Sequence, residues 1–234
     1  AGAAMSGIGE NVAAVRAGIA AACEKAGRDP SDVLLLGVTK YVDTERIGEA
    51  LDAGITAVGE NHAQELREKL TFFEQRKCDV HFIGQLQTNK IKYVCGFARL
   101  IHSVDRLPLA EQISARAARL GITQEILLQV NIGAESQKGG ISRDETLSLL
   151  ESVAALPALC IEGLMCVPPA MEEERVRPYF AAMRELLFAA KNAFPELQLS
   201  TLSMGMSHDY RTAVEEGATI VRVGSAIFGA RDRL

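Results

Sequence analysis

Residues 33–40 read Val33-Leu34-Leu35-Leu36-Gly37-Val38-Thr39-Lys40. The run is apolar on both alternating faces, which is typical of a strand buried within a parallel sheet. Lys40 falls where this strand must end, because Asp43-Thr44-Glu45 follows with the pattern of a helix N-terminus. A buried ammonium is costly unless it is paired, neutral or covalently linked. From this segment alone, the simpler interpretation is a lysine that extends from a strand end to the surface.

The pattern of this strand recurs along the chain. Further short apolar segments alternate with helical patterns, at residues 55–58, 80–83, 100–103, 126–131, 160–165, 199–203 and 220–223. An additional helix is predicted ahead of the strands, over residues 6–27. Eight strands alternating with helices predict a parallel sheet, and their spacing favours a single α/β TIM barrel, (β/α)8, over the alternative of a doubly wound open sheet.

Length and composition limit the class of protein. We expect one domain over residues 1–234, and one interpretation of residues 1–4, ahead of Met5, is a cloning remnant. The net charge of −5 argues against nucleic acid as the main partner. No apolar run predicts a membrane span, and no leader pattern precedes the first helix. The five cysteines lack C-x-x-C spacing and are expected to be free thiols in a reducing cytoplasm.

Polar residues collect at one end of the predicted strands. In a βα barrel the active site lies at the carboxyl ends of the strands, and these ends carry Lys40, Asn61, Ser203 and Arg222. A lysine at such a place can form a Schiff base, which removes the cost of a buried ammonium.

The loops after the last two strands combine glycine with serine. Ser207 lies in the first loop, and Gly224 and Ser225 form the second. Backbone N–H groups in such loops favour a phosphate, because glycine allows close approach. A lysine, a phosphate cradle and an arginine around one barrel mouth indicate an aldehyde cofactor that carries a phosphate. Arg222 is then expected near the ring nitrogen, where its fixed charge disfavours protonation of the ring.

The histidines are given a structural interpretation first. His81 and His102 lie on predicted strands and are expected to be hydrogen-bonded core residues. His208 follows the Ser207 loop and lies either near the ligand or at a solvent-facing helix start. No cluster of His, Cys or carboxylate side chains has metal-ligand spacing, so no metal is predicted.

These residues belong to a wider pattern of ordered motifs. The motifs are Gly37-Val38-Thr39-Lys40, Gly59-Glu60-Asn61, His81-Phe82-Ile83-Gly84, Leu86-Gln87-Thr88-Asn89-Lys90, Ile101-His102-Ser103-Val104-Asp105, Ser203-Met204-Gly205-Met206-Ser207-His208-Asp209-Tyr210 and Val221-Arg222-Val223-Gly224-Ser225-Ala226-Ile227-Phe228-Gly229. On these motifs the chain resembles the pyridoxal phosphate homeostasis proteins, the YggS/PROSC family, over almost its whole length.

The resemblance implies a fold like the N-terminal domain of alanine racemase, and it implies residue roles. Pyridoxal 5'-phosphate would be attached to Lys40, with phosphate contacts from Ser207, Gly224 and Ser225 and with Arg222 near the ring nitrogen. The function implied is buffering and transfer of the cofactor to apo-enzymes, in support of vitamin B6 and amino-acid homeostasis, without established turnover.

Some positions depart from the family pattern. Gln85 replaces a frequent histidine, His62 replaces a frequent tyrosine, and Tyr41 follows the lysine where other residues are common. All three are expected near the barrel mouth, where they bear on the contacts of the cofactor ring.

Alternatives to the carrier function remain open on the sequence. An amino-acid racemase would need two acid/base groups on opposite faces of the substrate carbon. Alanine racemase adds a C-terminal β domain, whereas this sequence ends at Leu234, so the carrier is favoured and a monomer is expected. A third possibility is a cofactor-free Schiff-base lyase that uses Lys40 and binds a phosphorylated substrate.

Overall fold

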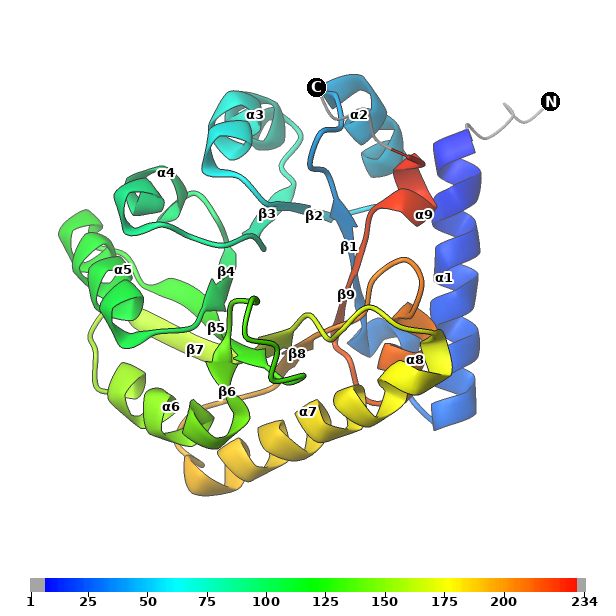
Figure 1. Cartoon of the computed structure of the whole chain (residues 1–234). Coiled ribbons are helices and arrows are strands. Elements are labelled where there is room, and N and C mark those ends of the chain that lie inside the picture. Colours follow the sequence, from blue (N-terminus) through cyan, green and yellow to red (C-terminus); the bar gives the residue numbers. More distant parts are fainter. Residues whose placement is uncertain (1–6, 231–234) are drawn as a thin grey trace.

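The computed structural model describes residues 7–230 and forms a closed barrel of parallel strands surrounded by helices (Figure 1). The barrel strands are β1 Leu34–Val38, β2 Ala57–Glu60, β3 Asp79–Phe82, β4 Leu100–Val104, β5 Gln124–Asn131, β7 Leu159–Cys166, β8 Thr201–Ser203 and β9 Ile220–Val223. Neighbouring strands pair in parallel, β9 returns to β1, and the pairing of β4 with β5 closes the ring. The predicted (β/α)8 barrel is confirmed, and an open sheet is excluded.

Helices cover the outside of the barrel (Figure 1). They are α2 Thr44–Asp52, α3 Ala63–Gln75, α4 Ile91–Val94, α5 Leu107–Leu120, α6 Thr146–Ala154, α7 Glu173–Ala193, α8 Tyr210–Glu215 and α9 Ser225–Phe228, with 3₁₀ turns η1 Pro30–Asp32, η2 Thr88–Lys90 and η3 Arg143–Glu145. The additional helix predicted at the start of the chain is α1, Gly7–Ala26, which packs against α2, α8 and α9. Residues 1–4, interpreted as a cloning remnant, lie outside the described residues.

The alternation of side chains explains why β1 is apolar on both faces. Leu36 belongs to a small apolar cluster that also contains Leu100 of β4 and Leu127 of β5, across the barrel. Its neighbour Leu35 belongs to the large cluster between the barrel and the helices. Successive residues of a strand point to opposite faces, so each strand of a barrel must satisfy two apolar environments.

Two short elements were not predicted, and one strand is displaced. The strand β6, Ile141–Ser142, pairs with the end of β5, and α9 follows the last barrel strand. Both are too short to show a periodic pattern. The segment expected at residues 55–58 begins at Ala57, because the N–H of Ile55 is bonded to Ala50 O in the last turn of α2.

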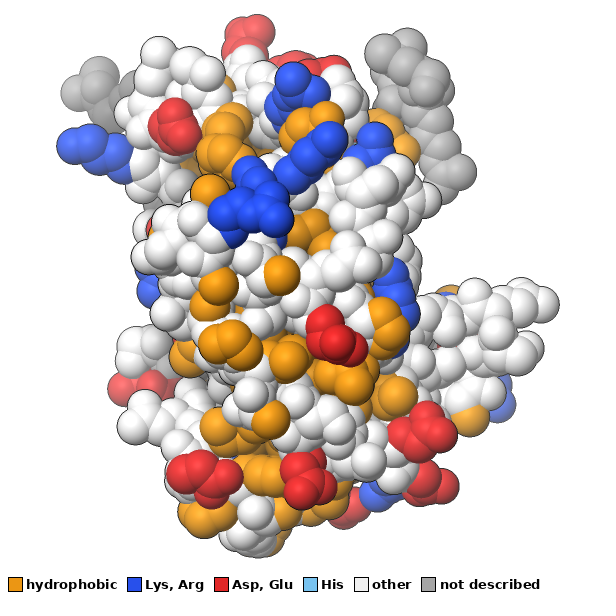
Figure 2. All heavy atoms as spheres, turned by 90° about the vertical axis from the view of Figure 1, so that its left-hand side faces the viewer, with side chains coloured by type: hydrophobic (Ala, Val, Ile, Leu, Met, Phe, Trp, Pro, Cys, Tyr) orange, Lys and Arg blue, Asp and Glu red, His pale blue; other side chains and the backbone are white. Residues whose placement is uncertain are grey.

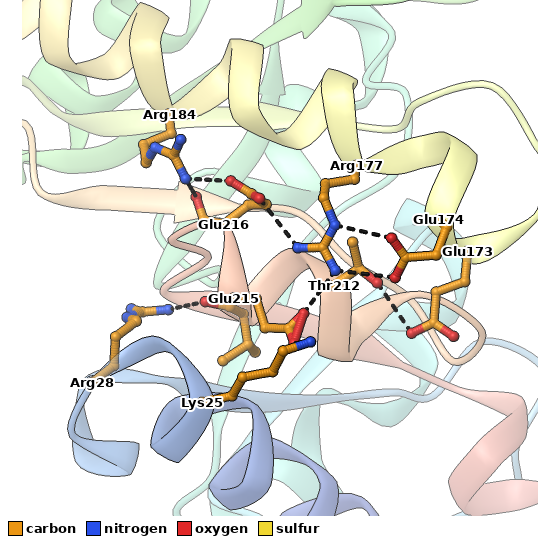
Figure 3. Close-up of polar contacts among 10 residues, drawn as sticks. Lys25, Arg28, Glu173, Glu174, Arg177, Arg184, Thr212, Glu215 and Glu216 are labelled. Atoms are coloured by element: carbon orange, nitrogen blue, oxygen red, sulfur yellow. Dashed lines mark hydrogen bonds and ion pairs between the residues drawn. The ribbon is translucent and has the colours of Figure 1, made fainter.

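A network of ion pairs joins α7, α8 and α1 on the outside of the barrel (Figure 3). Arg177 of α7 contacts Glu215 at 2.8 Å and Glu216 at 3.1 Å. Lys25 of α1 contacts Glu215 from the other side at 2.9 Å. The hydrogen bonds from Lys25 and Arg177 lower the pKa of Glu215. The network thus joins the C-terminal end of α8 to α7 and α1, and the loop that carries Ser207 leads into the other end of α8.

The side of the barrel shown in Figure 2 has a mixed surface. Lysine and arginine side chains gather in its upper half, acidic side chains lie both at its top and in its lower half, and apolar atoms are scattered between them. A groove of about 400 Å³ runs between η2, α4 and α5, and its lining includes Lys92, Arg116 and Arg119. Across residues 7–230 no helix combines the length and the apolar character that crossing a bilayer requires.

Candidate functional site

A cavity of about 270 Å³ lies at the carboxyl ends of β1, β8 and β9. Its lining residues are Val38, Lys40, Met206, Ser207, His208, Arg222, Gly224 and Ser225. The structure therefore brings together five of the residues singled out from the sequence, and they come from segments about 180 residues apart in the chain. The carboxyl-terminal face is the end of a βα barrel where ligands bind.

Larger cavities exist, but they lack this combination of side chains. One of about 630 Å³ lies at the opposite end of the barrel, where β1 begins near Leu34 and β3 begins at Asp79. It is lined by several carboxylates and contains no lysine. The groove at α4 and α5 contains cations but lies outside the barrel. The smaller cavity around Lys40 is therefore the candidate site.

Lys40 is partly buried at the point where the chain leaves β1. The strand is held up to its end, since Thr39 N donates to Gly59 O at 3.0 Å. The next residue, Tyr41, has a φ of +60°, which turns the chain away from the barrel axis toward α2. The lysine is thus carried by a turn whose backbone is fixed on the strand side and sharply bent on the other.

Arg222 is buried in the barrel with only 4% of its surface exposed. Its Nη1 donates to Ser203 Oγ at 2.6 Å, and its Nη2 donates to Cys166 O at 2.8 Å. Burial lowers the pKa of Arg222, and both of these acceptors are uncharged. A buried cation with neutral partners favours a ligand that brings an acceptor or a negative charge into the cavity.

A hydrogen-bonded chain continues from Arg222 into the barrel. Ser203 Oγ lies 2.9 Å from His102 Nδ1, and His102 Nε2 lies 2.9 Å from His81 Nδ1. Burial lowers the pKa of His81 to about 4 and that of His102 well below its usual value. Both histidines are therefore neutral core residues at pH 7, and the structural interpretation of them is confirmed.

Because Arg222 can only donate, the donor and the acceptor of each hydrogen bond in this network can be assigned. A guanidinium can only donate, so Ser203 Oγ accepts from it and has its own hydrogen available for His102 Nδ1. His102 then donates from Nε2 to His81 Nδ1, which places the remaining N–H of His81 at Nε2. This tautomer satisfies every bond of the chain and is assigned from the network. His81 lines the cavity at the opposite end of the barrel.

The two glycine–serine loops are joined to each other. Ser207 Oγ accepts a hydrogen bond from Ala226 N at 3.0 Å, and Gly205 O accepts from Arg222 N at 2.9 Å. Gly205 has a φ of +102°, a conformation that favours glycine. The start of α9 at Ser225 and the Ser207 loop therefore form one wall of the cavity. Backbone N–H groups at such a turn suit an anion.

Ser203 and Asn61 do not line this cavity. Ser203 lies behind the cavity, where its hydroxyl accepts a hydrogen bond from the cavity residue Arg222. Asn61 lines a neighbouring cavity of about 330 Å³ together with His62 and Gln85, and its Oδ1 is buried with no partner among residues 7–230. Asn61 thus lies in a different cavity from Lys40, and His62 follows it as the N-cap residue of α3.

Tyr41, His62 and Gln85, at which the resemblance led us to expect other residues, lie at the rim. The hydroxyl of Tyr41 lies 3.2 Å from His62 Nε2, with ring centroids 5.7 Å apart, so two of the departures contact each other. Gln85 packs against Gly139, where a Cβ would lie 2.0 Å from Gln85 Nε2. His208 is half exposed at the rim and lies 3.4 Å from Asp209. No sequence pattern predicts the Tyr41–His62 pair, because each residue is an ordinary surface polar group when considered alone.

A buried group behind Lys40 was also not found from the sequence. Lys69, Glu60 and Glu65 form an ion-paired cluster beneath the turn that carries Lys40. Two features signal it: Glu65 and Lys69 are four residues apart on a helix, and Glu60 ends an apolar strand. Neither feature alone distinguishes the cluster from a solvated helix face.

Comparison with known proteins defines the class to which this fold belongs. The sequence model of the alanine racemase N-terminal domain matches residues 10–232. An alanine racemase from Clostridium difficile superposes with a TM-score of 0.69 at 14% identity, over 96% of this chain and 57% of the racemase. At that identity the likeness shows the fold, which is the barrel of the alanine racemase N-terminal domain.

More similar proteins define the family. The pyridoxal phosphate homeostasis protein of Aquifex aeolicus is 44% identical over 95% of this chain and 97% of its own length. The Escherichia coli protein of the same name is 40% identical over 97% and 98%. PipY of Synechococcus elongatus, solved with pyridoxal phosphate bound, has a TM-score of 0.84 at 32% identity, over 95% of this chain and all of PipY. The chain belongs to the pyridoxal phosphate homeostasis protein family.

Proposed function

We propose that the chain binds pyridoxal 5'-phosphate at the barrel mouth, with the Lys40 amine as covalent anchor, and that it buffers the cofactor and hands it on. The observation that carries the proposal is the meeting of Lys40, Arg222 and the loop of Gly224 and Ser225 in one cavity of about 270 Å³. A volume near 300 Å³ suits a ligand with one aromatic ring. PipY, which has the same fold, was solved with this cofactor bound.

The side chains of the cavity fit the parts of this cofactor. Ser207, Gly224 and Ser225 hold the phosphate through backbone N–H groups and hydroxyls. Arg222 directs an N–H toward the ring nitrogen, and Ser203 holds Arg222 in that orientation. Asn61 lies on the adjacent side of the mouth, and in this proposal its unpartnered Oδ1 contacts the ring side of the ligand.

The cofactor supplies an aldehyde and a pyridine ring. The amine nitrogen of Lys40 would bond to the aldehyde carbon, and a Schiff base would form with release of water. Arg222 holds a permanent positive charge beside the ring nitrogen and keeps a proton from it, which weakens the ring as an electron sink. These residues therefore store the cofactor and do not promote carbanion chemistry.

The carrier role is favoured over an amino-acid racemase by the side chains of the cavity. A racemase needs an acid/base group on each face of the substrate carbon. Among the residues described as lining the cavity, the titratable groups are Lys40, Arg222 and His208, and His208 is half exposed at the rim. The relatives from Aquifex and Escherichia are named as homeostasis proteins.

The proposal also concerns where and with whom the protein acts. We place it in the cytoplasm as a monomer that donates cofactor to apo-enzymes, since its five cysteines are free thiols. Size-exclusion chromatography with light scattering measures the oligomeric state. Transfer is measured by mixing the loaded protein with a pyridoxal-phosphate apo-enzyme and following recovery of that enzyme's activity.

The test of binding is the visible spectrum of the purified protein, followed by borohydride reduction and peptide mapping. A yellow protein whose reduced adduct lies on Lys40 supports the proposal. Lys40→Ala should lose the adduct and keep much of the affinity that comes from the phosphate. A colourless protein that does not take up the cofactor favours the Schiff-base lyase. Substrate-dependent exchange of an amino-acid α-proton in deuterated water favours the racemase.

A further inference from the structure

Three charged side chains form a cluster directly behind Lys40. The ammonium of Lys69, on α3, lies 2.8 Å from Thr39 O, 2.9 Å from Glu60 Oε1 and 2.6 Å from Glu65 Oε2. The Lys69 side chain is 11% exposed and the Glu60 side chain is fully buried. Each hydrogen of the ammonium therefore has an oxygen acceptor, and one of these acceptors belongs to the backbone of the residue before Lys40.

The cluster holds both sequence neighbours of Lys40. On one side, Thr39 O accepts a hydrogen bond from Lys69, and Thr39 Oγ1 donates one to Glu60 Oε1 at 2.7 Å. On the other side, Tyr41 N donates to Glu65 Oε2 at 2.7 Å. The peptide groups on either side of Lys40 are thus bound to one rigid set of charges on β2 and α3.

The backbone at this turn needs such support. Tyr41 has a φ of +60°, in the left-handed region that residues with a side chain rarely adopt. In this turn Tyr41 N donates a hydrogen bond to the carboxylate of Glu65. Strained conformations of this kind persist where the surroundings determine them, and they are concentrated at functional sites.

Stability alone does not explain the cluster. Removing charges from water is expensive, and apolar residues of similar volume often give equal or greater stability than a buried ion pair. Glu60 Oε2 and Glu65 Oε1 are buried without a hydrogen-bond partner among the described residues. The cluster is costly to bury, and it is hydrogen-bonded to the two peptide groups on either side of Lys40. Its role is therefore best explained by its effect on the position of Lys40.

We propose that Lys69, together with Glu60 and Glu65, is a positioning group that fixes the backbone of Lys40 so that its amine reaches the aldehyde carbon of the ligand. The inference rests on the proposed function and goes beyond it, since it assigns a role to a second lysine. Lys69 is not an alternative anchor, because its ammonium is bonded to three acceptors. Fixing an attacking group in its reactive geometry raises the yield and rate of condensation.

The experiment compares two ligands on Lys69→Met, with Lys191→Met as control. Pyridoxal 5'-phosphate condenses with Lys40. Pyridoxine 5'-phosphate has the same ring and phosphate but an alcohol in place of the aldehyde, so it reports the pocket alone. Lys191 lies exposed on α7, away from the mouth. The spectrum and the borohydride-reduced adduct measure condensation, and calorimetry measures the affinity for the alcohol.

The positioning role predicts a selective loss. In Lys69→Met, the rate and extent of condensation should fall roughly tenfold, the effect of losing hydrogen bonds to a charged group. Affinity for pyridoxine 5'-phosphate should stay as in the wild type, and Lys191→Met should match the wild type for both ligands. Equal loss of both ligands, or unchanged condensation, overturns the inference.

Glu65 provides a milder test should Lys69→Met fail to fold. Glu65→Ala removes the acceptor of Tyr41 N and leaves the Lys69–Glu60 pair in place. Glu65→Gln keeps an oxygen that can accept from both Tyr41 N and Lys69. Condensation should therefore be reduced in Glu65→Ala and restored in Glu65→Gln. Equal condensation in the two variants overturns the inference.

The same data separate this inference from the proposed function. If the wild type binds pyridoxine 5'-phosphate but forms no adduct with pyridoxal 5'-phosphate, the anchor role of Lys40 fails. If the wild type forms the adduct and the cluster variants form it equally well, only the positioning role of Lys69 fails.

Discussion

Arg222 donates a hydrogen bond of 2.6 Å from Nη1 to the hydroxyl of Ser203. This contact joins the candidate site to the interior of the barrel, because the same hydroxyl lies 2.9 Å from His102. Ser203 thus fixes the plane of the guanidinium without neutralising it. An arginine held in this way keeps its charge on the cavity side, and its orientation depends on Ser203 and the two histidines behind it.

Replacing Ser203 with alanine should destabilise the protein. Arg222 would lose an acceptor and His102 a donor, both in a buried place. Leaving buried polar groups unsatisfied costs about 1–3 kcal/mol of unfolding free energy. Urea denaturation of Ser203→Ala measures the loss, and Ser200→Ala, at an exposed position, should be within error of the wild type. Equal stability of Ser203→Ala and the wild type would contradict the network.

His81 should make stability fall in acid. Burial lowers its pKa from 6.5 to about 4, so between these values the unfolded chain binds more protons than the folded one. Stability therefore falls as the pH drops through this window, by about 2 kcal/mol between pH 7 and pH 5 for this group alone. His102 adds to the effect in the same direction.

The contribution of His81 is isolated by comparing it with a side chain that does not titrate. The difference in unfolding free energy between the wild type and His81→Gln should shrink as the pH falls from 7 to 5. A difference that stays constant over this range would show that His81 does not titrate as its burial implies.

Glu162 should make stability fall as the pH rises, which is opposite to the effect of His81. Burial, followed by its contact with Glu125, raises the pKa of Glu162 to about 7. The folded state then holds the proton more tightly, so this stabilising contribution is present at low pH and is lost as the pH rises through 7. Glu162→Gln should be more stable than the wild type above this pH, by about 1 kcal/mol after allowance for solvent screening. Thermal unfolding at pH 6 and pH 8 measures it, and an equal difference at both values would exclude the shift.

Arg177 should contribute a salt-sensitive stability. It joins Glu174, Glu215 and Glu216, with its own side chain 28% exposed (Figure 3). Arg177→Ala should lower the unfolding free energy by about 1 kcal/mol at low ionic strength and by less in about 1 M salt. Arg143→Ala, which removes an exposed pair at 3.9 Å, is the control and should have little effect. A loss that is independent of salt would mean that Arg177 acts through packing.

The barrel was predictable because its signal is local. Each strand is a short apolar run, and its end is marked by a polar residue or glycine, as at Lys40 and Gly224. Once eight such units are counted, the fold places their ends at one mouth. The meeting of Lys40 with Arg222 followed from this rule without knowledge of any side-chain contact.

The features of the candidate site that could not be predicted from the sequence depend on where individual side chains point. Asn61 follows the end of β2, but it lines a different cavity from Lys40, and a rule based on strand ends does not contain the geometry that separates the two cavities. The pairing of His81 with His102 requires the stagger between β3 and β4, and Lys69 reaches Thr39 from a helix 30 residues later. Such contacts are set by rotamers and packing, and no pattern along the chain encodes them.

Gly205 should be required for the cavity wall at which we propose that the phosphate binds. Its φ is +102°, and a Cβ there would lie 2.6 Å from the Cβ of Ala213 on α8. Gly217 has a similar φ of +108°, but a Cβ there would meet only the flexible side chain of Arg184, at 3.5 Å. Alanine at either position introduces comparable backbone strain of about 1 kcal/mol or more. Only Gly205→Ala also pushes the Ser207 loop away from α8.

The two glycine variants should therefore differ in ligand binding more than in strain. Gly205→Ala should weaken binding of pyridoxine 5'-phosphate roughly tenfold or more, because the loop that meets the phosphate is displaced. Gly217→Ala should lose stability and bind the ligand as the wild type does. Calorimetric titration of both variants measures the affinities at a temperature where both are folded. Equal affinities would mean that the phosphate is held by the Gly224 and Ser225 loop without help from the loop of Ser207.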